Sequence, residues 1–251
     1  MKNSLVQSFR QIQQKDIIWS DRYLSKTLFH AGFWVRKRLD VAIASHAKLA
    51  HGVLLDVGCG AKPYEKIFEP YVEHYFGLEY SPESGYRGNN ADFCGDAAAL
   101  PLADESVDTI LCTEVLEHLS NPEKTIAEFA RVLRPSGTVI TTAPFVYPIH
   151  DAQDFFRYSP DGLAAIMQRH GLTIDKVKPL SGTAVTLAAM INLYWYEIGF
   201  MWTKWLYPVG LVLRPALWLI CFVVNVLGGI FEFILPSQHL SFNHITIAKK
   251  S

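Results

Sequence analysis

A polar stretch just past the middle of the chain holds the side chains best suited to chemistry. Residues 144–158 read PFVYPIHDAQDFFRY and include His150, Asp151, Asp154 and Arg157. His150 can act as a general base for a hydroxyl acceptor, a role that contributes about 10²–10⁴-fold to a rate. Asp151 or Asp154 can orient its ring or bind sugar hydroxyls, and Arg157 can hold a carboxylate or phosphate through two parallel hydrogen bonds. We therefore predict that these four residues are catalytic.

The same residues allow two other interpretations. Asp154 and Arg157 can form a local salt bridge while Tyr158 docks the following helix, which would make the stretch a structural loop. A metal site built from His150, Asp151 and Asp154 is disfavoured, because the sequence shows no further cluster of ligands beside them. We therefore expect no metal.

A second group of residues forms a glycine turn after an apolar run. The segment 54–60 reads LLDVGCG, so the carboxylate of Asp56 lies close to Gly58 and Gly60. Glycines permit positive φ angles and let a ligand approach the backbone. The dinucleotide fingerprint GxGxxG needs a third glycine where this chain has Pro63, and proline also lacks an N–H that could face a phosphate. The turn therefore favours a nucleoside ligand without pyrophosphate over a dinucleotide, and an ordinary strand-to-helix turn is the plain alternative.

Two more acids follow in the order that a nucleoside site needs. Glu79 ends the run HYFGLE, nineteen residues after Gly60, where a carboxylate can accept both ribose hydroxyls. Asp96 lies in the turn 95–97 and can accept a hydrogen bond from an adenine amino group. The alternative for Glu79 is a surface acid at a strand end, and a Gly-Asp turn such as that at Asp96 is common.

Alternating apolar runs and amphipathic stretches over residues 51–181 must position these groups. The runs are Val53–Val57, Tyr75–Glu79, Val107–Cys112, Thr138–Ala143 and Leu172–Val177. Asn121 and Ser159, each followed by proline and an acid, predict two helix starts. Residues 244–248 (HITIA) predict one more strand. The alternation favours an α/β fold with a parallel, doubly wound sheet, whose carboxyl edge would carry the polar stretch.

Composition limits the classes of protein that the chain can belong to. It has 251 residues, 50% hydrophobic and 19% charged, which excludes a disordered chain. The net charge of −1 argues against a nucleic-acid partner, but residues 1–50 hold nine Lys/Arg against three Asp, a net of +6. Such a basic arm indicates an anionic surface as partner. The four cysteines show no CxxC pair and are expected to be reduced and buried, and the N-terminus lacks the apolar core of a signal peptide.

Residues 183–235 form a hydrophobic insert before the last predicted strand. They carry only four charged side chains, and 215–231 carry none, which is close to the shortest length that spans a bilayer. Four of the six tryptophans lie in the insert, as is typical of a membrane interface. Since the flanking strands would share one sheet, the insert must cross a membrane an even number of times. We expect helices that lie in, or dip into, the cytosolic leaflet; a spanning hairpin and a buried homodimer interface are the alternatives.

Taken together, the motifs resemble the small-molecule (type-11) branch of the class I S-adenosylmethionine-dependent methyltransferases. The resemblance is carried by LLDVGCG, FGLE, GDAAALP, SVDTILCTEVLEHL and EFARVLRPSGTVI within residues 52–181, and by the strand 243–249. It implies a Rossmann-like seven-stranded sheet of order 3-2-1-4-5-7-6, with S-adenosylmethionine as cofactor. The cofactor-binding residues that it implies are Asp56, Gly58, Cys59, Gly60, Glu79, Asp96, Ala97, Thr113 and Glu114. His118, in the same turn as the last two, is expected to pack against or cap a helix.

These observations predict a methyltransferase that acts on a hydrophobic or lipid-linked acceptor, through O-methylation. The loop pattern PxxxPxHDxxDFxRY resembles a subgroup associated with cell-surface glycan and lipid-glycan modification. The alternatives are C-methylation of a membrane quinone or prenylated ring, and a non-catalytic partner of a membrane glycosyltransferase. The predicted parts are a basic helical arm (1–50), a methyltransferase domain (51–182 with 243–251) and a membrane-associated insert (183–242), at the inner face of a membrane.

Overall fold

The computed structural model covers most of the chain. It describes residues 24–80, 90–205 and 207–251, without the side chains of residues 200–212. The first 23 residues of the expected basic arm therefore lie outside the described residues, as do the side chains of Trp202, Lys204 and Trp205 in the insert.

The chain divides into two compact units, which differ from the three parts expected from the sequence. Residues 1–40 group with 181–240, and residues 41–180 group with 241–251. The expected arm is thus shared between the units. In the described part of that arm, residues 24–32 form successive turns and not the expected helix, and α2 spans Phe33–His46.

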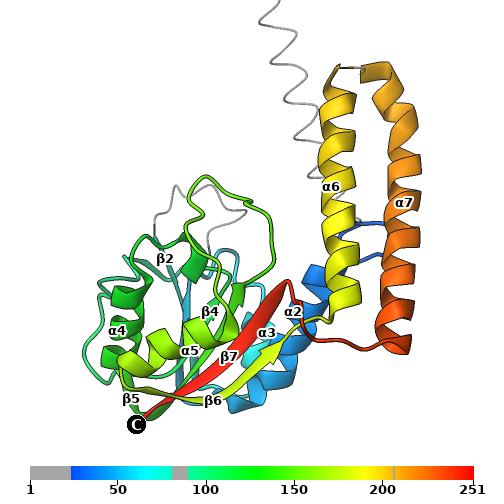
Figure 1. The fold of residues 1–251 in the computed structure, drawn as a ribbon. Coiled ribbons are helices and arrows are strands. Elements are labelled where there is room, and N and C mark those ends of the chain that lie inside the picture. The colour runs from blue at the N-terminus through cyan, green and yellow to red at the C-terminus, as the bar shows by residue number, and fades with distance from the viewer. Residues whose placement is uncertain (1–23, 81–89, 206) are drawn as a thin grey trace, which may run out of the picture. The chain divides into compact units, whose positions relative to one another are not determined.

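The larger unit is built on one seven-stranded sheet (Figure 1). Its strands are β1 (Val53–Val57), β2 (His74–Glu79), β3 (Phe93–Cys94), β4 (Val107–Thr113), β5 (Leu133–Pro144), β6 (Leu172–Pro179) and β7 (Asn243–Lys250). The order β3-β2-β1-β4-β5-β7-β6 confirms the predicted one, with β7 antiparallel to both neighbours. Parallel pairing of β1, β2, β3, β4 and β5 brings their carboxyl ends to one edge, which is where open α/β sheets bind ligands.

Helices connect these strands, and two of them, α4 and α5, begin where the sequence predicted. The helices of this unit are α3 (Glu65–Phe68), α4 (Pro122–Val132) and α5 (Pro160–Arg169), with 3₁₀ turns η1 (Ala47–Leu49) and η2 (Leu116–His118). The Asn121 side chain accepts a hydrogen bond from the Lys124 amide at 3.1 Å, and Ser159 accepts one from Gly162 at 3.1 Å. Both residues thus satisfy amides that would otherwise lack a partner at the start of α4 and α5.

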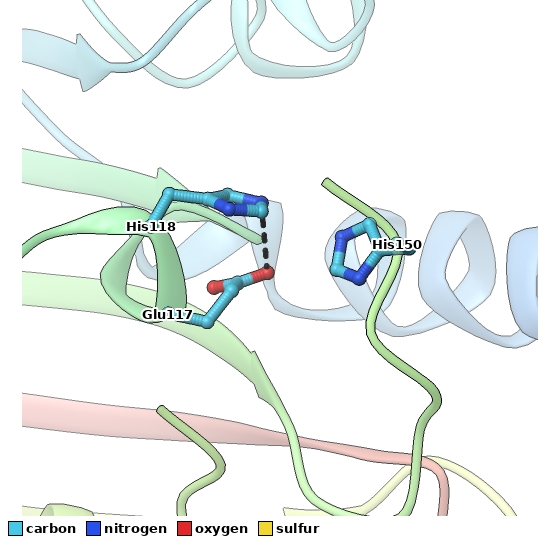
Figure 2. Close-up of side chains that lie close together, drawn as sticks. All are labelled: Glu117, His118 and His150. Atoms are coloured by element: carbon cyan, nitrogen blue, oxygen red, sulfur yellow. Dashed lines mark ion pairs between the residues drawn. The ribbon is translucent and has the colours of Figure 1, made fainter. Parts of the chain in front are cut away.

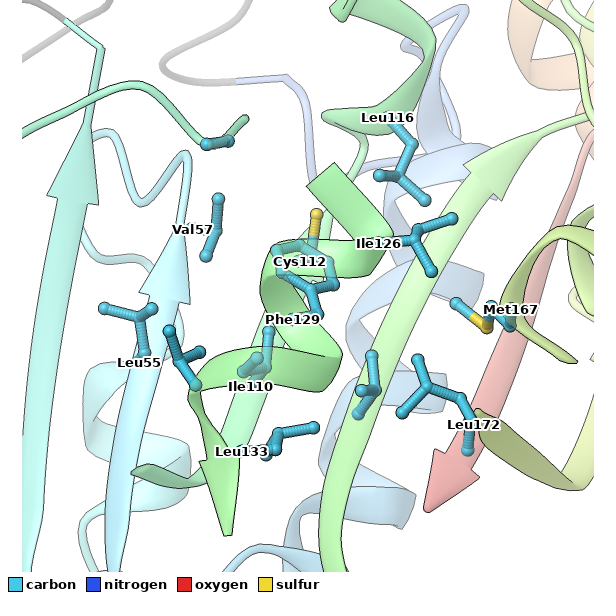
Figure 3. Packing of buried hydrophobic residues seen from close by; sticks show 14 of the residues in the cluster. Leu55, Val57, Ile110, Cys112, Leu116, Ile126, Phe129, Leu133, Met167 and Leu172 are labelled. Carbon is cyan, nitrogen blue, oxygen red and sulfur yellow. The ribbon is translucent and has the colours of Figure 1, made fainter. Parts of the chain in front are cut away.

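The core lies where α4 and α5 pack on one face of the sheet (Figure 3). Ile126 and Phe129 of α4 and Met167 of α5 are fully buried against strand residues such as Leu55 and Ile110. Truncating a buried phenylalanine such as Phe129 to alanine costs about 3–5 kcal/mol of stability. Packing of this strength fastens α4 and α5 to the sheet, whose strand ends carry the site.

The smaller unit is dominated by two long helices that run antiparallel side by side, α6 (Thr183–Trp205) and α7 (Tyr207–Ile234) (Figure 1). They approach closely at Gly228, where a Cβ would lie 2.5 Å from the Cβ of Ala188. Among the described residues one stretch, Leu213–Ile234, is long and apolar enough to cross a membrane, with a mean hydropathy of 2.2. The insert is therefore helical, as expected.

Polar groups inside the smaller unit explain two of its few hydrophilic residues. Asn225 is fully buried; it accepts a hydrogen bond from Asn192 at 2.9 Å and donates to the Leu28 carbonyl at 2.8 Å. Glu232 accepts hydrogen bonds from amides at the start of α6 and from Arg38 at 2.8 Å. Arg38, one of the cations of the basic arm, thus pairs with an acid of α7, although 37% of its side chain stays exposed.

Candidate active site

The glycine turn after β1 has the geometry that its residues predicted. Gly58 and Gly60 have φ angles of +71° and +49°. A Cβ on Gly58 would meet Val115 Cγ2 at 2.4 Å, so the turn packs directly against the segment that follows β4. Among the described residues a Cβ on Gly60 would meet no atom within 4 Å, whereas the Gly60 N–H donates to Glu79 Oε2 at 3.1 Å. The turn therefore leaves open space beside a carboxylate at the ligand-binding edge.

Asp56 and Cys59 are both enclosed within this turn. Asp56 is 2% exposed and accepts a hydrogen bond from the Tyr75 hydroxyl at 2.6 Å. Burial raises the pKa of its carboxyl group to about 7. Burial likewise raises the pKa of the Cys59 thiol to about 12, so this cysteine is a neutral packing residue. The four cysteines are free thiols, but the expectation that all are buried is wrong for Cys94, which is exposed on the edge strand β3.

The remaining predicted cofactor residues follow β3 and β4. Asp96 is exposed and accepts a hydrogen bond from the Ala98 amide at 2.8 Å, while Ala97 is buried beneath it. Thr113 ends β4 and is half-buried. Glu114 has a φ angle of +53° and accepts a hydrogen bond from Asn243 of β7. Burial raises the pKa of Glu114 to about 7. These residues thus lie at the same edge as the glycine turn.

The polar loop after β5 is held together by Arg157, which corrects its predicted role. Its Nε donates to the Tyr147 carbonyl, and its two terminal nitrogens donate to the carbonyls of Pro148 and Phe156 and to both carboxylate oxygens of Asp154. All five N–H donors of the guanidinium are therefore used. Arg157 has none left to hold a substrate carboxylate or phosphate, and the salt-bridge alternative describes it.

Asp154 links this scaffold to His150. Its side chain is 1% exposed, and the Arg157 hydrogen bonds hold the pKa of its carboxyl group well below the usual range. Asp154 Oδ2 lies 3.1 Å from His150 Nδ1, so Asp154 orients the ring, as one prediction held, and is too buried to bind sugar hydroxyls. Burial lowers the pKa of His150. Asp151 is exposed, and its Oδ1 accepts a hydrogen bond from the Ala152 amide at 2.6 Å.

Glu117, whose sequence position suggested no role, lies at the centre of this region. Glu117 is fully buried, and neither carboxylate oxygen has a hydrogen-bond partner among the described residues. Burial, and then the nearby charge of Glu114, raise the pKa of Glu117 to about 8. Its backbone carbonyl accepts hydrogen bonds from the amides of Phe155 and Phe156, which fastens the polar loop to the η2 turn. The signal in the sequence was an acid followed by histidine just after a strand.

His118 and His150 lie beside the Glu117 carboxylate (Figure 2). His118 Nε2 lies 3.7 Å from Glu117 Oε1, and the two histidine rings have their centroids 5.0 Å apart. The nitrogen and oxygen atoms of the three side chains that can bind a metal all lie within 4.8 Å of one another. The structure therefore groups His150 with Glu117 and His118 and not with Asp151. His118, which was expected to pack against or cap a helix, instead lies beside a buried acid and a second histidine.

Comparison with known proteins decides the family. A sequence model of the methyltransferase domain matches residues 55–141. An uncharacterized methyltransferase from Mycobacterium bovis (strain BCG / Pasteur 1173P2) is 34% identical over 110 residues, which cover 40% of this chain and 43% of that protein. The chain carries a class I methyltransferase domain of the type-11 branch.

Two further similarities concern part of the sequence and the fold. A demethylmenaquinone methyltransferase from Renibacterium salmoninarum is 31% identical over 116 residues, 46% of this chain and 48% of that protein. The chain thus spans less than half the length of these curated relatives. A solved S-adenosylmethionine-dependent methyltransferase from Archaeoglobus fulgidus superimposes with a TM-score of 0.55 at 14% identity, over 93% of this chain and 99% of that one. At such identity the likeness shows the fold alone.

The cofactor of the methyltransferase domain is S-adenosylmethionine, and the edge of the sheet fits it. The open space at Gly60 and the neighbouring Glu79 carboxylate suit a nucleoside with ribose hydroxyls, and Pro63 leaves no third glycine for a pyrophosphate. Which residues hold each part of the cofactor stays a prediction: Asp56 the methionine moiety, Glu79 the ribose and Asp96 the adenine.

Proposed function

We propose that this methyltransferase transfers a methyl group to a hydroxyl oxygen of a hydrophobic or lipid-linked acceptor. The observation that carries the proposal is the cluster of Glu117, His118 and His150, which can activate a hydroxyl group. This cluster is close to the glycine turn of the cofactor site. Gly58 of that turn packs against Val115, which lies two residues before Glu117.

The chemistry sets what the protein must provide. Bound S-adenosylmethionine supplies a methyl group on a cationic sulfur, and the carbon–sulfur bond breaks with its electron pair left on sulfur as the acceptor oxygen bonds to the carbon and loses its proton. The protein must therefore align the acceptor and take charge of that proton. Asp154 and Arg157 keep the His150 ring in place, while Glu117 offers a carboxyl group that has no hydrogen-bond partner among the described residues.

The helical unit supports the hydrophobic nature of the acceptor. The stretch Leu213–Ile234 is only 17% buried in its most apolar window, and Phe233 is 87% exposed. An apolar helix that the described part of the chain leaves uncovered favours a lipid environment. We propose that residues 183–235, with the basic residues near the N-terminus, bind the inner face of a membrane.

A transfer assay tests this function. The full chain in detergent would be incubated with S-adenosylmethionine carrying a labelled methyl group and a total lipid extract, and the labelled product identified by mass spectrometry. We expect a methyl ether or ester in a lipid fraction. His150→Ala should reduce turnover by about 10²–10⁴-fold while S-adenosylhomocysteine binds as before. His74→Ala, at an exposed histidine of β2, is the matched control.

The demethylmenaquinone methyltransferase relative favours a second candidate, C-methylation of a quinone ring. The same assay distinguishes the two, since base releases the methyl group of an ester and hydriodic acid releases that of an ether, whereas a methyl group bonded to a ring carbon survives both treatments. Absence of any methyl release from labelled cofactor with every fraction would instead favour a non-catalytic role beside another membrane enzyme.

A further inference from the structure

We infer that Glu117, His118 and His150 form a binding site for one divalent transition-metal ion. The inference deepens the proposed function, and its catalytic consequence rests on that function, whereas metal binding itself does not. The three residues come from two segments, the η2 turn and the loop after β5, which the hydrogen bonds between Glu117 and the loop amides hold together (Figure 2).

The buried carboxylate is the first argument. The side chain of Glu117 is fully buried, and both of its oxygens lack a hydrogen-bond partner among the described residues. Burying a carboxylate without hydrogen bonds or a counter-charge is costly, and native structures rarely leave such a group unsatisfied. A metal ion supplies the missing partner.

The orientation of the two histidines is the second argument. His118 Nδ1 lies 2.6 Å from the Gln153 carbonyl; His150 Nδ1 lies 3.4 Å from the Pro148 carbonyl and 3.1 Å from Asp154 Oδ2. Because these oxygens only accept hydrogen bonds, Nδ1 carries the proton in each neutral ring and Nε2 keeps its lone pair. Metal-binding histidines are oriented in this way, through the second nitrogen, by carbonyl or carboxylate groups.

The donor set indicates the kind of ion. Two imidazoles and one carboxylate suit Zn²⁺, Mn²⁺, Fe²⁺ or Co²⁺ better than Ca²⁺ or Mg²⁺, which prefer oxygen. The three donor atoms lie within 4.8 Å of one another. Metal–ligand bonds of about 2.1 Å place neighbouring donors about 3 Å apart, so the groups must close by about 1–2 Å. His150 lies in a loop without regular structure, which can make this movement.

A metal held by three protein ligands keeps positions open for other ligands. An acceptor hydroxyl bound there would have its pKa lowered, so that its proton leaves to solvent as the oxygen attacks the methyl carbon. His150 would then act as a ligand rather than as a general base. The site would thus select acceptors by a hydroxyl group that can reach the ion.

Direct metal binding tests the inference without any acceptor. The untagged full chain in detergent, stripped with EDTA and then dialysed, would be titrated with Co²⁺ by visible absorption and calorimetry. We expect one Co²⁺ per chain. His118→Ala, His150→Ala and Glu117→Gln should each weaken binding by at least about 10-fold, while His74→Ala should leave it unchanged. Binding of S-adenosylhomocysteine by each variant checks that it has folded.

The outcomes separate this inference from the proposed function. Absence of saturable 1:1 binding, or equal affinity in His150→Ala and the unaltered chain, overturns the metal site. Methyl transfer that persists at full rate in metal-free chain overturns the catalytic role inferred for the ion, but leaves the proposed function standing. Stoichiometric Co²⁺ binding that depends on all three residues supports the site even if no acceptor is methylated, a result that would count against the proposed function alone.

Discussion

Replacing each of three glycines with alanine would separate three effects at the cofactor site: backbone strain, overlap with the ligand and overpacking. Gly58, Gly60 and Gly171 all have positive φ angles, of +71°, +49° and +79°. An alanine at such a position costs about 1–2 kcal/mol in backbone strain. At Gly171, between α5 and β6, a Cβ meets nothing within 4 Å, so Gly171→Ala measures that strain alone.

Gly60→Ala should differ from this control only in binding. A Cβ at Gly60 also meets no protein atom within 4 Å, so its effect on the free energy of unfolding should match that of Gly171→Ala. If the open space is where the cofactor lies, the methyl group must displace part of it. We expect the Kd for S-adenosylhomocysteine to rise at least about 10-fold, or about 1.4 kcal/mol, by calorimetry. Gly171→Ala should leave that Kd unchanged.

Gly58→Ala should lose stability as well. Its Cβ would lie 2.4 Å from Val115 Cγ2 and 3.4 Å from Val115 Cβ. A β-branched side chain cannot move aside cheaply, so overpacking should add about 1–3 kcal/mol to the strain. Adding Val115→Ala removes both close methyl groups and should recover that increment in thermal unfolding. Equal affinity for S-adenosylhomocysteine in Gly60→Ala and Gly171→Ala, or no recovery in the double variant, would refute this account of the turn.

Three further predictions concern single side chains. Glu79→Ala should weaken S-adenosylhomocysteine binding by about 1–3 kcal/mol by calorimetry, because ribose hydroxyls lose a charged acceptor, whereas the exposed Glu73→Ala should not. Arg157→Lys should lower the free energy of unfolding by about 1–3 kcal/mol and reduce turnover, because lysine cannot serve five acceptors at once. An unchanged free energy of unfolding would contradict the role of Arg157 in holding the loop together. His244 is 1% exposed with neither ring nitrogen hydrogen-bonded, and burial lowers its pKa to about 4. Its stability contribution is complete above about pH 6.5 and is lost as the pH falls toward 4, up to on the order of 3 kcal/mol. His244→Leu should therefore reduce the change in the free energy of unfolding between pH 6.5 and 4, measured by chemical denaturation. His51→Gln, at an exposed histidine, should leave that change as it is.

Local signals in the sequence predicted the sheet and the cofactor edge. The helix starts at Asn121 and Ser159 were predictable because a capping side chain binds an amide three residues away. The glycine turn was predictable because positive φ angles favour glycine whatever surrounds it. Strand order followed from the resemblance to a known family, since apolar runs alone do not say which strands pair.

The roles of the polar residues could not be predicted in the same way, because their partners come from distant segments. Arg157 looked like a substrate anchor by type, yet its donors go to backbone carbonyls that only the folded loop presents. In the sequence Glu117 is one acid among many beside a predicted helix; packing buries it without a hydrogen-bond partner among the described residues. His118 gains a second histidine, His150, only because the loop after β5 folds back beside it. The sequence alone determined which elements form and which cofactor their edge suits. The tertiary structure decided which side chains are used up in holding the loop and which are left for chemistry, because hydrogen-bond partners depend on where the chain folds back upon itself.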